Sequence, residues 1–182
     1  MGLKQFFREL IAGESDRPTN DTALLEEMAK LSTPNGTLDS AHMKQLDEEV
    51  QPYLAEEDAE AALELAGQKR QNGNELQAVY LFRKLTTHFP ERRQDCEIRI
   101  GQAYFNLAKY PKAIESYIAA RVHGAESRRI DRCIWETCHA MYNTCEDPVR
   151  CCDALNIYLR LCPQGEHREQ AQRMLQAAMP SR

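Results

Sequence analysis

The sequence predicts an all-α protein: a short solenoid of three helix hairpins, with an N-terminal helical arm before it and a C-terminal capping helix after it. Three observations predict this fold. The same order of small and aromatic residues occurs twice at a spacing of 35 positions, each copy has a turn sequence between two helical runs, and a third, longer copy follows. We expect an arm over residues 1–57 and a repeat domain over residues 58–182.

The first predicted helix covers residues 3–11, where apolar residues have the i, i+3, i+4, i+7, i+8 spacing of an amphipathic helix. Its apolar side is the predicted contact surface of the arm and consists of Leu3, Phe6, Phe7, Leu10 and Ile11. Three alternatives stay open for this surface: packing on the chain's own repeats, contact with a second copy in a homodimer, and binding to a membrane surface or another partner. Because Lys4 and Arg8 are its only basic residues, the membrane alternative has the least support.

Two further helices are predicted before the repeats. Apolar residues over 24–31 indicate a short helix, and a turn follows at Thr33-Pro34-Asn35-Gly36. Apolar residues from Met43 to Val50 indicate the next helix, which is expected to end before Pro52.

The two matching copies pair a small residue in a first helix with an aromatic residue in a second helix. The small residue, the following alanine and the aromatic residue are Ala66, Ala78 and Phe82 in the first copy and Gly101, Ala113 and Tyr117 in the second. A small residue lets two helix backbones approach, and the ring fills the volume beside it. Turns are expected at Gly73-Asn74 and at Lys109-Tyr110-Pro111. With a period of about 34 residues, the tetratricopeptide repeat has this arrangement. Repeats are therefore expected at about 59–92 and 94–127.

A third copy is expected at about residues 132–164. Trp135 begins a first-helix pattern, W-x2-L-G-x2-Y, in which several positions are replaced. The copy is longer because of extra residues in the turn at 145–149. After Gly165, residues 166–178 have apolar residues on one face only, which predicts the capping helix that a solenoid needs at its end.

Composition and charge exclude several classes of function. The chain is 42% hydrophobic and 28% charged, and it contains no apolar stretch long enough for a signal peptide or a membrane-spanning helix. We expect a cytoplasmic protein without direct membrane insertion. A net charge of -5 argues against nucleic acid as a partner.

Neither a catalytic site nor a cofactor site is predicted. Six of the seven cysteines crowd into the last third of the chain, but no C-x2-C pair exists and several occupy core positions of helices. The five histidines are scattered without a partnered nucleophile, and no Gly-rich phosphate loop is present. We expect no enzyme activity, no metal and no cofactor.

The predicted functional surface is the concave side of the solenoid, which the first helix of each hairpin lines. Residues between the core positions of these helices are expected to form a peptide-binding groove: Leu63, Gly67, Arg70, Ile98, Gln102, Phe105, Glu136 and Ala140. Leu63, Ile98 and Phe105 would supply apolar pockets. Arg70, Gln102 and Glu136 would supply polar contacts. Such a groove suits an extended or partly helical peptide with a few apolar anchors.

Several runs of residues resemble those of the class II chaperones of type III secretion systems. They are Leu81 to Thr86, Arg99 to Gln102, Ala113 to Tyr117, Leu161-Cys162 and Ala171 to Leu175. The chain is also similar to that family in its size, its helical arm, its three divergent repeats and its single closing helix. The resemblance implies a cytoplasmic chaperone that holds a pore-forming translocator protein soluble until export by binding an N-terminal peptide segment of it in the concave groove. It also implies a homodimer formed through the arm, as in many members of the family.

Two features depart from the family pattern. Members often have aromatic residues on the inner face of the first repeat, where this chain has Leu63, Gly67 and Arg70, so the bound motif is expected to differ. The arm is also longer. The main alternative is a general tetratricopeptide adaptor that joins two proteins of a bacterial assembly without chaperoning either. A regulatory subunit of an enzyme is the third interpretation.

Overall fold

All secondary structure in the described part of the chain is helical. The computed structural model describes residues 38–145 and 148–178. Its helices are α3 (Ser40–Ala55), α4 (Ala59–Gln71), α5 (Glu75–His88), the 3-10 helix η1 (Pro90–Arg92), α6 (Arg93–Asn106), α7 (Tyr110–Val122), α8 (Ser127–Thr144), α9 (Pro148–Leu161) and α10 (Arg168–Ala178). The prediction of an all-α fold is confirmed for these residues. The helices predicted at 3–11 and 24–31, with the arm contact residues Leu3, Phe6, Phe7, Leu10 and Ile11, lie outside the described residues.

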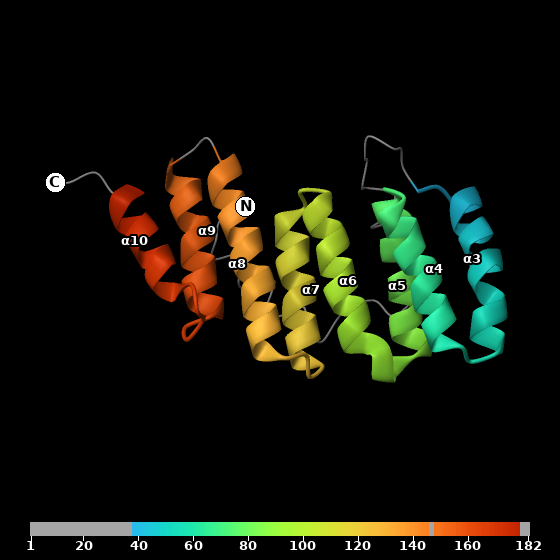
Figure 1. The fold of residues 1–182 in the computed structure, drawn as a ribbon. Helices are drawn as coiled ribbons and strands as arrows, with labels where there is room; N and C mark the ends of the chain where they lie inside the picture. Colours follow the sequence, from blue (N-terminus) through green and yellow to red (C-terminus); the bar gives the residue numbers. More distant parts are fainter. Residues whose placement is uncertain (1–37, 146–147, 179–182) are drawn as a thin grey trace.

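The helices lie side by side in chain order, from α3 at one end of a row to α10 at the other (Figure 1). Each α-helix packs against the next one along the chain, and α3 also contacts α5. One hydrophobic core runs through the row from Leu38 to Leu175. The predicted domain boundary at residue 57 falls in the turn between α3 and α4, and the helices on both sides of it contribute to this core.

One turn geometry ends α3, α4, α6 and α7. In each of these turns a residue takes a left-handed conformation, with φ of 54° at Glu57, 78° at Gly73, 54° at Ala108 and 92° at Gly124. Backbone N–H groups at and after this residue return to carbonyls of the last helical turn, as in a Schellman motif. The same turn therefore satisfies free carbonyl groups at the C-terminal ends of these four helices.

The backbone repeats with the period found in the sequence. After α4, the N–H groups of Asn72, Gly73 and Asn74 donate to the carbonyls of Gln68, Arg70 and Lys69. After α6, the N–H groups of Leu107, Ala108 and Lys109 donate to the carbonyls of Ala103, Phe105 and Tyr104. Every donor and acceptor of the second set lies 35 positions after its counterpart, so the first two hairpins share one turn as well as one pattern of side chains.

Helix α3 begins at a side-chain cap and continues through a proline. Asp39 accepts a hydrogen bond from the His42 N–H at 2.9 Å, which is a typical N-cap. The prediction that this helix ends before Pro52 is wrong, because the helix extends to Ala55. The residues after Pro52 pack against the core, and their burial offsets the hydrogen bond that proline cannot donate.

Close contact between α6 and α7 depends on Gly101. A Cβ atom at this position would lie 2.4 Å from the Tyr117 ring, which is itself buried. In the first hairpin, Ala66 and Phe82 are both completely buried at the corresponding positions. The third hairpin differs, since His139 replaces the small residue, is half-buried and stacks on Trp135 with ring centroids 5.2 Å apart.

Candidate peptide-binding face

Helices α4, α6 and α8 lie next to one another along one side of the row. Three contacts establish this order. The position of a Cβ atom on Gly67 of α4 is 3.8 Å from Nη1 of Arg99 on α6, and Arg70 donates from Nη1 to Oε1 of Gln102 at 2.8 Å. Arg129 of α8 lies 4.0 Å from Oδ1 of Asp95 on α6. We call the side formed by these three helices the first-helix face.

The structure corrects two of the eight predicted groove residues. Leu63 is 6% exposed and Ile98 is 1% exposed, and both belong to the hydrophobic core instead of lining an apolar pocket for a ligand. The reason is that each first helix is covered on two sides. Helix α6, for example, packs against both α5 and α7, so its buried stripe is wider than the pattern of a single hairpin suggests.

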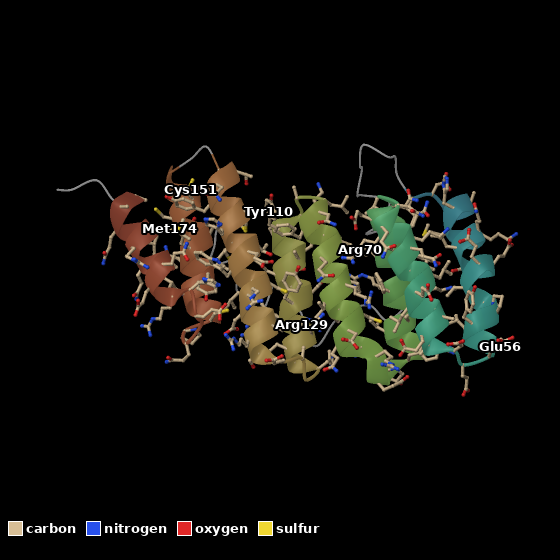
Figure 2. The ribbon with its side chains drawn as sticks, viewed as in Figure 1. Glu56, Arg70, Tyr110, Arg129, Cys151 and Met174 are labelled. Atoms are coloured by element: carbon tan, nitrogen blue, oxygen red, sulfur yellow. The ribbon has the colours of Figure 1, made fainter. Side chains whose placement is uncertain are left out.

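Arg70 and Gln102 are brought together as a bridge between α4 and α6. Both side chains are half-buried, and the hydrogen bond from Arg70, which is labelled in Figure 2, to Gln102 spans the two helices. Gly67 lies one turn before Arg70 and is buried. Because Gly67 has no side chain, only the backbone of α4 faces Arg99 at this position.

Phe105 is half-buried at the end of α6. Its ring meets that of Tyr110, at the start of α7, edge to face with centroids 5.8 Å apart. Part of the ring therefore remains available to a partner, and Phe105 is the apolar residue of the predicted set that best suits direct contact with a peptide.

On α8, Glu136 is exposed and Ala140 is half-buried. The pKa of the Tyr117 hydroxyl links this helix to the other two. Burial raises that pKa, the charge of Glu136 raises it further, and the charge of Arg70 lowers it. Residues of α4 and α8 therefore lie near the same ring from α7, and the face is electrostatically mixed.

Arg99 is a residue of this face that the sequence reasoning missed. Its guanidinium lies over the Phe82 ring, 5.8 Å from the centroid, and reaches across to Gly67. A signal was present, because Arg99 follows a predicted groove residue and lies 35 positions after Glu64. Arg99 lies between the buried residues Ile98 and Ile100, so the local pattern of this helix does not place it on the face.

Two of the described cysteine thiols, those of Cys96 and Cys162, are poorly suited to nucleophilic chemistry. Burial raises the pKa of Cys96 to about 12 and that of Cys162 to about 12, so both are protonated at neutral pH. Within residues 38–145 and 148–178, no group of three or more His, Cys, Asp and Glu side chains could hold a metal ion. In the same part of the chain, none of the helices has the length and apolar character needed to cross a membrane.

Comparison of the chain with models of protein families, with curated proteins and with solved structures finds no significant match.

Proposed function

We propose that this chain is a tetratricopeptide-type repeat protein that binds a peptide segment of another protein on its first-helix face. The observation that carries the proposal is the repetition of the α4 turn after α6 at 35 positions, in side-chain pattern and in backbone hydrogen bonds alike. Stacked hairpins of this kind expose a continuous surface formed by their first helices, and such surfaces commonly bind peptides.

The proposed cellular role is that of a cytoplasmic chaperone for a translocator of a type III secretion system. The resemblance of residues 81–86, 99–102 and 113–117 to that family supports this role, as does the small size of the stack. A translocator has segments that seek a membrane, and these segments aggregate in water unless a partner covers them. Binding on the first-helix face would keep the client soluble and competent for export.

A general adaptor for two proteins of a bacterial assembly is the second candidate. The burial of Leu63 and Ile98 favours it, because the first-helix face loses two apolar residues that would bind a client's apolar segments. The remaining face has more polar groups, and polar recognition is common in adaptors that bind reversibly.

Co-expression separates the two candidates. We expect a translocator encoded beside the gene of this chain to become soluble when the two are produced together, and the complex to survive gel filtration. Phe105→Ala should weaken the complex, whereas Val122→Ala on α7, where the side chain is 60% exposed, serves as the matched control. A stable complex without any gain in client solubility would favour the adaptor. No complex and no gain in solubility would refute the chaperone proposal.

A further inference from the structure

Arg99 carries a positive charge that no group in the described part of the chain neutralises by direct contact. It makes no hydrogen bond and no ion pair there; its guanidinium lies over the Phe82 ring, and its Nη1 is 3.8 Å from the position that a Cβ atom on Gly67 would take. The side chain is half-buried, so water compensates only part of the charge. A guanidinium in this situation has donors free to bind an anion.

Arg70 provides a second guanidinium group at the contact between α4 and α6. Gly67 and Arg70 are one turn apart on α4, and Arg99 and Gln102 are one turn apart on α6, with Arg70 bonded to Gln102. That bond uses one N–H group of Arg70, so its other donors stay available. A Cβ atom at Gly67 would have only Nη1 of Arg99 within 4 Å, so no other side chain crowds α4 at this point.

Two other arginines on this side of the row are in ion pairs. Arg92 pairs with Glu60, and Arg129 pairs with Asp95. The Glu75 carboxylate interacts electrostatically with Arg70, and its Oε1 accepts a hydrogen bond from Asn106 at 2.7 Å. Arg70 and Arg99 are therefore two guanidinium groups between α4 and α6 that make no ion pair with the described residues, while the exposed Glu136 of α8 adds a negative charge on the same face.

We propose that Arg70 and Arg99 bind the carboxylate of an Asp or Glu side chain in a peptide that lies across α4 and α6. The inference rests on the proposed peptide-binding function and names the chemistry of the partner. A carboxylate matches the planar donor array of a guanidinium, and a half-buried site strengthens the charge-assisted hydrogen bonds. A nucleic acid fits less well, because its many phosphates would be repelled by an acidic protein.

The test uses the full-length protein and an array of short overlapping segments from the translocators encoded beside its gene. Each segment is paired with a copy in which every Asp and Glu is replaced by Asn and Gln. We expect the binding segments to lose about tenfold in affinity on this replacement. Arg99→Gln and Arg70→Gln should abolish the difference between the paired segments. Arg173→Gln, an exposed residue of α10, removes the same charge elsewhere and should leave the difference unchanged.

Each remaining outcome has a distinct meaning. Equal binding of the acidic and amide segments would overturn the inference and leave the proposed function standing. Absence of any binding segment would refute the proposed function, and the inference with it. Binding of a labelled single-stranded DNA that Arg99→Gln abolishes would overturn the carboxylate assignment in favour of phosphate. A melting temperature lowered by Arg70→Gln and Arg99→Gln but not by Arg173→Gln, without peptide binding, would mean that residues of this chain fill the site and would also overturn it.

Discussion

Gly101 is the residue at which α6 and α7 come into direct contact. Its missing side chain leaves room for the Tyr117 ring, whereas Gly67 on α4 has only Arg99 at an ordinary contact distance of 3.8 Å. The two glycines therefore occupy helices for different reasons. Gly101 is required by packing, and Gly67 is tolerated although glycine destabilises a helix interior.

A pair of alanine substitutions tests this difference. Gly101→Ala forces the buried Tyr117 ring to move, and overpacking costs about 1–3 kcal/mol, which exceeds the gain of about 1 kcal/mol from higher helix propensity. Gly67→Ala has the same gain in propensity without the clash. In urea denaturation followed by circular dichroism, we expect the first variant to be less stable and the second to be at least as stable as the wild type. Equal stability of the two variants would refute the packing explanation.

Sequence patterns located the apolar positions of the first helices but not their exposure. Leu63 and Ile98 lie between the predicted core positions of the first helices, which is why the sequence predicts that they face a ligand. Burial depends instead on the neighbouring hairpins, which the local pattern of one helix does not describe. Arg70 and Gln102 were placed on the face from the sequence, but the hydrogen bond that joins them needed the structure.

At the scale of helices, Arg121 connects three elements. From α7, its Nη2 donates to Oδ1 of Asp131 on α8 at 2.6 Å, and its Nη1 donates to the carbonyl of Leu161 at the end of α9 at 2.9 Å. The two charged side chains are 29% and 21% exposed, so solvent screens their interaction only in part. Arg121 therefore ties the third hairpin to the second.

Removal of this connection should destabilise the fold more than removal of a surface ion pair. We expect Arg121→Met to lower the free energy of unfolding by about 1.5–3 kcal/mol, the range for hydrogen bonds to charged groups. Arg128→Met is the matched control, because Arg128 pairs with Glu166 while 75% exposed, and such pairs contribute about 1 kcal/mol or less. A double-mutant cycle with Asp131→Asn measures the coupling. A cost for Arg121→Met no larger than that for Arg128→Met would argue against the connecting role.

The turns show how far the sequence reaches at this scale. Gly73 correctly predicted the first turn, because glycine adopts a left-handed φ more readily than other residues. The equivalent residue of the second hairpin is Ala108, for which no local rule predicts a left-handed conformation. We therefore expected the turn at Lys109-Tyr110-Pro111, whereas α7 already begins at Tyr110 with Pro111 in its first turn. The period of 35 residues was the better guide, since it relates Ala108 to Gly73.

For the molecule as a whole, the two ends of the row are held by different contacts. At one end, Asp47 of α3 accepts hydrogen bonds from Tyr80 at 2.7 Å and Lys84 at 2.5 Å on α5. At the other end, the ring of Trp135 stacks with those of both His139 and His167, with centroid distances of 5.2 and 4.9 Å. Within the described residues, α3 and α10 each bury their apolar side against the row and turn polar residues outward.

The first-helix face is then the extended surface to which the account assigns function. A client bound there must contact the residues of α4, α6 and α8 and leave the opposite helices free. Phe105 and Val122 distinguish binding on the first-helix face from binding on the opposite helices. Phe105 lies on α6 of this face, and Val122 is an exposed residue of α7.

Site-specific photo-crosslinking of the full-length protein, co-produced with a translocator encoded beside its gene, tests the central claim most directly. The photoreactive residue p-benzoylphenylalanine replaces Phe105 in one variant and Val122 in the other, and mass spectrometry identifies what is attached. We predict a crosslink to one segment of the client from position 105 and none from position 122. A client crosslinked from position 122 and not from position 105 would contradict the assignment of peptide binding to the first-helix face.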